Sequence, residues 1–196
     1  MRRFSNQRAM EQFTNDHQDQ ESPMQRLVRM TMEHSQYKQN FSFPSLDEEW
    51  MVVPLGKLSK AMTSKNMLAI DCEMVGCQDG TEAIVRICAV DQNLKVIFDE
   101  KVNPGKAVAD YRTNITGIAA EDLEGVTCSL DDIKKSLRKL LAHGTILVGH
   151  SLHNDLQALK IDHLRVIDTS YIFKIKDLPA SYTPSLNNLC KANRAG

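Results

Sequence analysis

Two acidic residues in an apolar stretch are the first feature with chemical potential. Asp71 and Glu73 lie two positions apart, and on a β-strand such side chains project to the same face. Two unneutralised charges among apolar neighbours would cost several kcal/mol, a penalty that a divalent cation removes. Oxygen ligands without clustered histidine or cysteine favour Mg²⁺ or Mn²⁺ over zinc. The alternative is that one acid ends a strand in solvent while the other pairs with a base such as Arg86.

A third acid, Asp155, follows an apolar segment that ends at Gly149. We expect Asp155 in or just before the first turn of a helix, facing the C-terminal edge of a sheet, where open α/β sheets place ligand sites. A structural role fits its position equally well, because an acid at a helix start satisfies backbone N–H groups and the helix dipole.

The elements that must position these acids follow from apolar periodicity. A polar turn at 91–93 predicts a hairpin, and Ser129 with Asp132 predicts a helix start with an apolar face behind it. The order βββαβαβα is that of an α/β, ribonuclease-H-like domain, in which helices cover both faces of a mixed sheet. The expected strands are 67–75, 83–90, 94–102, 146–148 and 164–167.

A polar stretch that is expected to be flexible opens the chain. Ser22, Pro23 and Gln25 then predict a helix to about Tyr37, and a similar signal at 45–48 predicts a second, shorter helix. The expected division is a flexible tail (1–21), an N-terminal helical extension (22–60) and the main domain (61–196).

Composition limits the remaining possibilities. Lys plus Arg (24) and Asp plus Glu (25) nearly cancel, so any nucleic-acid contact must be local. Five cysteines without a CxxC pair argue against a disulfide framework and a structural zinc, and indicate a reducing compartment. No apolar run approaches the roughly 18 residues of a membrane span. We therefore expect an intracellular, soluble protein of undetermined oligomeric state, with no membrane or disulfide partner.

Several short motifs occur in a fixed order: Asp71–Gly76, Asp110–Gly117, Gly149–His150 with Asn154–Asp155, Asp168–Thr169 and Ser185–Cys190. In this order they resemble the motifs of the DEDD-type (DEDDh) 3′–5′ RNA exonucleases, and the subgroup that the chain resembles most is the plant small-RNA-degrading nucleases. The match runs from about residue 66 to 191. The segment Asp-Cys-Glu-Met-Val-Gly is a highly specific signature of this group.

The resemblance implies roles for individual residues. The acids corresponding to Asp71, Glu73 and Asp155 bind two Mg²⁺ ions, for which Mn²⁺ can substitute; one activates water and the other stabilises the departing 3′ oxygen. Met74 would pack against the terminal nucleoside, and Arg112 would reach the 2′-hydroxyl or a nearby phosphate. Without the family, Met74 is better interpreted as a core residue, and Arg112 equally well as part of a loop ion pair.

The implied activity is degradation of short single-stranded RNA to nucleoside 5′-monophosphates, with a nuclear location or, alternatively, a cytoplasmic one. Two other classes stay open. One is a catalytically inactive RNA-binding or regulatory protein that keeps the acids, and the other is a DNA-directed proofreading exonuclease.

The family's last motif pairs a general-base histidine with a fourth carboxylate beyond Ser185–Cys190. This sequence ends at Gly196, so we expect neither here, no general base in this chain, and activity reduced by the roughly 10²- to 10⁴-fold that such a base supplies. His163 and Asp168 have the right spacing, but they lie upstream, and on a strand their odd separation would send them to opposite faces. We take Asp168–Thr169 as the family's strand-end element instead.

Other polar residues carry weaker signals. His150 and His153, near Asp155, could touch RNA, orient a ligand or cap the helix, and neither is taken as the base. A basic stripe on the helix begun at Ser129 could attract phosphates, although a solvated helix face is the simpler interpretation. The stripe consists of Lys134, Lys135, Arg138 and Lys139.

Overall fold

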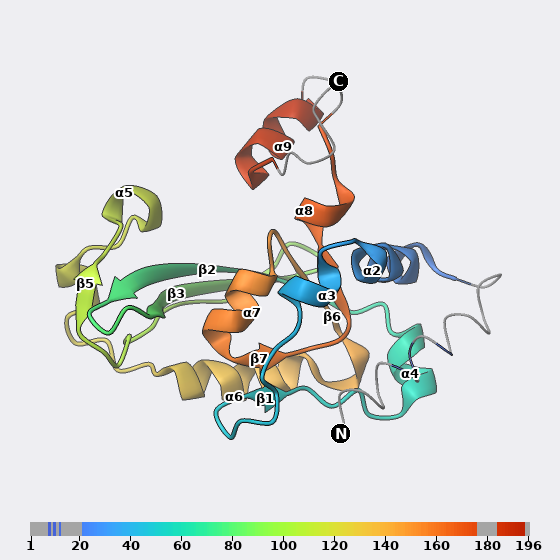
Figure 1. Cartoon of the computed structure of the whole chain (residues 1–196), viewed down its shortest axis with the longest axis horizontal. Helices are drawn as coiled ribbons and strands as arrows, with labels where there is room; N and C mark the ends of the chain where they lie inside the picture. The colour runs from blue at the N-terminus through green and yellow to red at the C-terminus, as the bar shows by residue number, and fades with distance from the viewer. Residues whose placement is uncertain (1–7, 9, 11, 13–20, 176–183, 195–196) are drawn as a thin grey trace.

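The computed structural model describes residues 8, 10, 12, 21–175 and 184–194 (Figure 1). Most of the segment expected to be a flexible tail, residues 1–21, lies outside the described residues. Within the described part, no helix is both long enough and apolar enough to cross a membrane.

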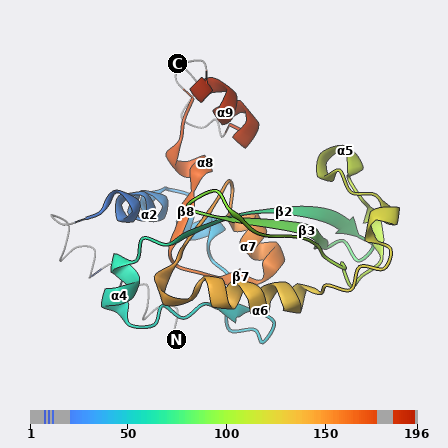
Figure 2. The ribbon, with the colours of Figure 1, turned by 180° about the vertical axis from the view of Figure 1, so that it is seen from behind.

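A mixed sheet forms the centre of the molecule (Figures 1 and 2). Its strand order is β4-β3-β2-β6-β8; β3 is antiparallel to β2 and β4, β6 is parallel to β2 and β8, and β5 pairs with the far end of β2. The strands are β2 (Met67–Cys77), β3 (Glu82–Asp91), β4 (Val96–Lys101), β5 (Val108–Asp110), β6 (Ile146–Gly149) and β8 (Val166–Asp168).

Helices cover the two faces of this sheet unequally. On one face, α6 (Leu130–Leu140) and α7 (His153–Leu159) pack through Leu137 and Leu156 against Ile70 of β2 and Ile87 of β3. On the other face, α2 (Pro23–Glu33) packs beside β8 in a cluster that also includes residues of β6. α4 (Leu58–Thr63) joins this cluster from the end of the sheet, where it lies against the turn before β6. The face that carries Asp71 is thus covered at the β6–β8 side, while Asp71 itself is exposed.

Short elements complete the chain. The helices are α3 (Tyr37–Asn40), α5 (Thr113–Thr116), α8 (Thr169–Ile172) and α9 (Leu186–Arg194), with 3₁₀ turns η2 (Ala120–Leu123) and η3 (Ala142–Gly144). A separate parallel pair joins β1 (Met51–Val52) to β7 (Ile161–Asp162). Figures 1 and 2 show α6 along one side of the sheet and α9 beyond the opposite side.

The expected α/β order βββαβαβα is confirmed, with β5 and β7 as short additions. The predicted cap of α2 is also present, because Ser22 and Gln25 exchange the two bonds of a capping box. This helix ends earlier than expected, at Glu33, and Tyr37 begins a separate turn of helix. Ser129 and Asp132 form a second capping box at the start of α6.

The predicted second helix at 45–48 is wrong, because these residues form turns. The hydroxyl of Ser45 hydrogen-bonds to the carboxylate of Asp162 on β7, so it is not used to cap a helix. Met51 N–H then donates to the carbonyl of Lys160 at 2.8 Å, which extends the chain beside β7. A partner distant in sequence therefore overrode the local cap signal.

The N-terminal extension is built into the main domain. Tyr37 and Phe41 belong to the same core as α6 and α7. The fully buried Arg165 donates to carbonyls of Ala61 and Gly144, and burial lowers the pKa of its guanidinium to about 10. These bonds tie α4 to the turn before β6, so the boundary expected at residue 61 falls inside a continuous packing unit.

Gly144 provides a test of this close packing. Its φ is +80°, and a Cβ there would lie 2.4 Å from Cα of Ala61. Gly144→Ala should therefore lower the free energy of unfolding by several kcal/mol, measured by urea denaturation. Gly80→Ala is the matched control, because φ is +78° but nothing lies within 4 Å, so only about 1–2 kcal/mol of backbone strain is expected. An equal loss of free energy of unfolding in Gly144→Ala and Gly80→Ala would contradict the contact between α4 and this turn.

Candidate active site

Asp71 and Glu73 project from the same face of β2, as expected. Ile70 and Cys72 are buried in the core formed with α6 and α7, while Asp71 is exposed and Glu73 is half-buried. Glu73 lies opposite Arg86 in the strand pair. Arg86, however, forms a bidentate pair with Asp99 at 2.8 and 2.7 Å. Within the described part of the chain, neither Asp71 nor Glu73 has an ion-pair partner.

Asp155 lies in the first turn of α7, as expected, and approaches the strand that carries the other two acids. Its Oδ1 accepts a hydrogen bond of 3.0 Å from the backbone N–H of Cys72, the residue between Asp71 and Glu73. This N–H is accessible because the pairing of β6 with β2 ends at Ala69. The shorter strand thus exposes the edge of β2 where Asp155 binds.

The charge of Asp71 affects the ionisation of the other two acids. Burial and the charge of Asp71 raise the pKa of Asp155 to about 7, although the bonds from Cys72 oppose the change. Burial and Asp71 also raise the pKa of Glu73, while Arg86 lowers it. A carboxylate that raises the pKa of its acidic neighbours marks a site with unneutralised negative charge.

The donor chemistry of these acids fits a divalent cation. All three offer oxygen ligands, which suit a hard ion, and a bound cation would neutralise the charge that raises their pKa values. Among the residues the structure describes, no three His, Cys, Asp or Glu side chains are already close enough together to hold an ion. The thiol of Cys72 is buried and directed into the core on the opposite face of β2, so we do not count it as a ligand.

Asp168 stabilises the turn that precedes α7. Its carboxylate accepts hydrogen bonds of 2.9 Å from the N–H groups of both Ser151 and Leu152. It also caps α8 by accepting from Ser170 N–H at 3.0 Å. The motif resemblance gives Asp168 only as a strand-end element of the family. The cap of α8 did have a local signal in the sequence. Asp168 ends an apolar strand two residues before Ser170, a position from which an acidic side chain can accept the first N–H groups of a helix.

The histidines near the acids have internal partners. His150 is bonded to Thr169 Oγ1 at 3.0 Å and to the carbonyl of Pro184 at 2.9 Å. His153 packs against the rings of Phe41 and Tyr171. These contacts give both side chains structural roles.

His163 and Asp168 do not form a pair. His163 is buried, its Nε2 lies 2.8 Å from the carbonyl oxygen of Thr145, and burial lowers the pKa of its imidazole to about 4. Asp168 is engaged with the turn before α7 instead.

Comparison with known proteins identifies the family. The Exonuclease family (RNase T) matches residues 68–195. The chain belongs to this exonuclease family. It is 56% identical over 189 residues to small RNA degrading nuclease 3 of Arabidopsis thaliana, covering 96% of this chain and 24% of that protein. It is 52% identical over 176 residues to small RNA degrading nuclease 2 of the same plant, covering 87% of this chain and 38% of that protein.

A solved structure supports the same fold. The catalytic unit of Neurospora crassa Pan2, with protease and nuclease domains, matches with a TM-score of 0.53 and 27% identity over 62% of this chain and 21% of that chain. The confirmed fold is thus the mixed α/β arrangement of ribonuclease-H-like exonucleases. The exonuclease chain spans between about a quarter and two fifths of the length of the two Arabidopsis relatives.

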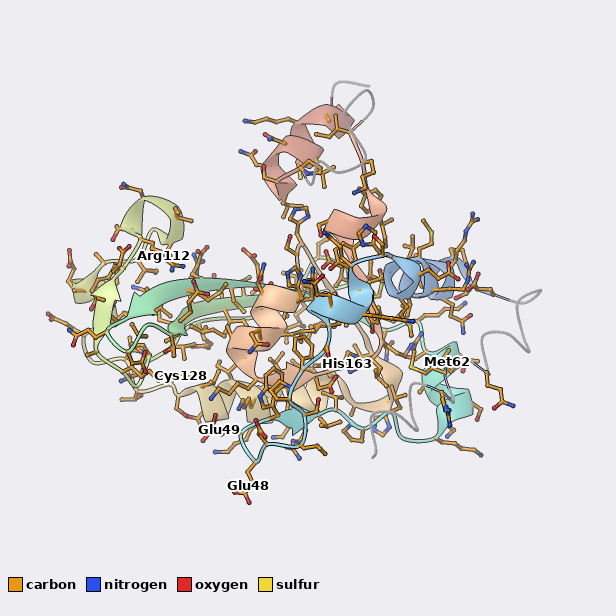
Figure 3. All side chains as sticks on the ribbon, viewed as in Figure 1. Glu48, Glu49, Met62, Arg112, Cys128 and His163 are labelled. Atoms are coloured by element: carbon orange, nitrogen blue, oxygen red, sulfur yellow. The ribbon has the colours of Figure 1, made fainter. Side chains whose placement is uncertain are left out.

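The two residues expected to contact substrate have protein partners in the exonuclease structure. Met74 is half-buried and packs against the main core. Arg112, at φ +48°, forms an ion pair of 2.6 Å with Glu82. Arg112 Nη2 would lie 3.7 Å from a Cβ placed on Gly76, so the guanidinium lies beside the strand that bears the acids (Figure 3). The substrate roles of Met74 and Arg112 stay predictions.

Three residues of the basic stripe, Lys134, Lys135 and Arg138, line a groove of about 610 Å³ between α6 and the segment around Glu48 and Glu49. Figure 3 labels these two glutamates. Lys134 donates to the carbonyl of Glu49 at 2.7 Å, and Lys135 pairs with Asp132 at 3.3 Å. Lys160 adds an ion pair with the side chain of Glu49. These intramolecular partners favour the interpretation of the stripe as an exposed, partly ion-paired helix face.

The pKa of Asp155 predicts how stability depends on pH. Its folded value of about 7 lies above the unfolded value of about 3.9, so between these pH values the folded state retains a proton that the unfolded state has lost. The contribution of Asp155 to the free energy of unfolding is therefore present below pH 4. It is lost as the pH rises to 7, by up to about 1.4 kcal/mol per pH unit. In EDTA, Asp155→Asn should gain stability relative to wild type as pH rises through this window, measured by urea denaturation. If the difference in free energy of unfolding between Asp155→Asn and wild type did not change with pH, the raised pKa of Asp155 would be contradicted.

Proposed function

We propose that the chain is the catalytic part of a 3′–5′ exoribonuclease that degrades short single-stranded RNA to nucleoside 5′-monophosphates. The observation that carries the proposal is the bond from Cys72 N–H to Asp155, which places a third carboxylate at the backbone between Asp71 and Glu73. The Arabidopsis relatives, named small RNA degrading nucleases, support RNA as the substrate class. We extend the proposal to a nuclear location.

The proposed cofactor is a pair of Mg²⁺ ions held by Asp71, Glu73 and Asp155, with Mn²⁺ as a substitute. Bound there, the metals would supply an activated water and stabilise the departing 3′ oxygen. The chain's own contribution is electrostatic. Exposed Asp71 and half-buried Glu73 line an accessible face of β2, while Asp155 is held at its edge by a backbone N–H. This arrangement concentrates negative charge, which attracts cations to the place where a phosphate would bind.

A second candidate is an RNA-binding protein that keeps these acids without hydrolysing RNA. It is favoured by the absence, among the described residues, of a group of three metal-binding side chains already close together. We assign no general base to the described residues. The two candidates make different predictions for the same incubation with RNA.

Asp71→Ala tests the metal-dependent reaction. Wild-type chain should shorten 5′-labelled RNA from its 3′ end in Mg²⁺ and not in EDTA, while Asp71→Ala should lose at least about a hundredfold in rate because a metal ligand is gone. The variant should fold, since Asp71 is exposed. Glu100→Ala, an exposed acid on β4, is the matched control and should retain activity.

The outcomes separate the candidates. Full activity in Asp71→Ala would overturn the metal assignment. RNA binding by wild type without shortening would favour the inactive RNA-binding protein.

Arg112 tests the preference for RNA. If its guanidinium contacts the 2′-hydroxyl, Arg112→Ala should raise KM for RNA by about tenfold and leave KM for the matched DNA nearly unchanged. Glu82→Gln breaks the same ion pair but keeps the arginine, so it should preserve the preference for RNA. Equal cleavage of RNA and DNA by wild type, unaffected by Arg112→Ala, would instead indicate a DNA-directed exonuclease.

A further inference from the structure

The turn between β6 and α7 is held by a residue from a different strand. α7 begins after Leu152 without any side-chain cap of its own. The carboxylate of Asp168, at the end of β8, instead holds the two residues just before the helix, with one oxygen on Ser151 N–H and the other on Leu152 N–H, both at 2.9 Å. Asp168 is fully buried, so these bonds are shielded from water.

The backbone of this turn needs such support. Ser151 has a φ of +53°, in the left-handed region, which costs a residue with a Cβ about 1 kcal/mol or more. Strained backbone persists where surrounding contacts over-determine it. Asp155 follows Leu152 by less than one helical turn. The direction of α7, and with it the position of the Asp155 carboxylate, therefore depends on Asp168.

Asp168 is itself held by the N-terminal extension. Its backbone N–H donates to the hydroxyl of Thr31 at 3.2 Å. Thr31 lies in the last turn of α2, is fully buried, and donates its own proton to the carbonyl of Leu27 at 3.0 Å. A continuous set of hydrogen bonds thus runs from α2 through β8 to the turn before α7, the helix that carries Asp155.

We propose that Asp168 is the positioning residue that sets Asp155 against β2, and that α2 holds Asp168 in place through Thr31. This inference rests on the proposed metal-dependent function, and it makes the N-terminal helix a supporting part of the active site. Burial would raise the pKa of Asp168, but its neighbours His153, Ser170 and Ser151 lower it, so the carboxylate stays charged and can accept all of these bonds.

Two pairs of variants separate positioning from general stability. Asp168→Asn puts an N–H₂ group where both carboxylate oxygens accept hydrogen bonds, and Thr31→Val removes the hydroxyl while keeping the shape of the side chain. Ser170→Ala is the control for Asp168, because it removes a donor to the same carboxylate and leaves the turn contacts intact. Val28→Ala is the control for Thr31, because Val28 is a buried residue of the same helix that packs in the apolar cluster with α4.

The first measurement is amide hydrogen exchange without metal. Exchange of the peptide covering residues 149–156 should accelerate in Asp168→Asn and Thr31→Val, because the turn is released. It should stay close to wild type in Ser170→Ala and Val28→Ala, even where these controls show the same drop in Tm. Wild-type protection of this peptide in folded Thr31→Val would overturn the role of α2. The same result in folded Asp168→Asn would overturn the positioning role.

The second measurement is the affinity for Mn²⁺, by titration calorimetry of the full chain. We expect binding about tenfold weaker or more in Asp168→Asn, as is found when residues that orient metal ligands are changed. In Thr31→Val, which loses one hydrogen bond a step further from the site, we expect binding about two- to fivefold weaker. The controls should bind as wild type does. If Val28→Ala and Thr31→Val weakened Mn²⁺ binding equally, Thr31 would contribute only to the stability of the fold. Lack of Mn²⁺ binding by wild type would refute the proposed function, while the exchange result would still decide the positioning claim.

Discussion

The site depends on one backbone group, the N–H of Cys72, left free on the edge of β2 because β6 is shorter than the strand it pairs with. A peptide N–H away from water requires an acceptor. Here the acceptor is a carboxylate, which brings a third negative charge to the strand segment that already bears Asp71 and Glu73. Burial and the charge of Asp71 raise the pKa of Asp155 to about 7, whereas the bond from Cys72 lowers it. A divalent cation is the chemical species that would restore neutrality.

The remainder of the fold supports this arrangement. α6 and α7 cover one face of the sheet and provide a dry core against β2 and β3. α2 covers the other face only beside β6 and β8, so the Asp71 side of β2 stays accessible. The extension therefore does two things: it completes the core where apolar residues would otherwise meet water, and it stops short of the acids. Arg165, buried against backbone carbonyls, shows how tightly the two parts are joined.

Several elements could be predicted because their signals are local. The capping boxes at Ser22 and Ser129 lie within one turn of helix, so nearby residues decide them. The hairpin after Asp91 is similar, since its side chain accepts from the N–H of Asn93 and Lys95. The signal at Ser45 failed because its hydroxyl bonds to Asp162, which is distant along the chain. β1, β7 and α4 escaped prediction for the same reason, since each is stabilised mainly by long-range partners.

The sequence by itself determined how the two acids of β2 are oriented and which family the chain belongs to. The strand period places Asp71 and Glu73 on one face, and the motif order identifies the family, because both depend only on residue type and spacing. The tertiary structure alone decided that Asp155 reaches the edge of β2, that Arg86 is occupied by Asp99, and that Asp168 holds the turn before α7. These contacts join strands and helices far apart in the chain, and their formation depends on strand length and packing, which no local pattern encodes.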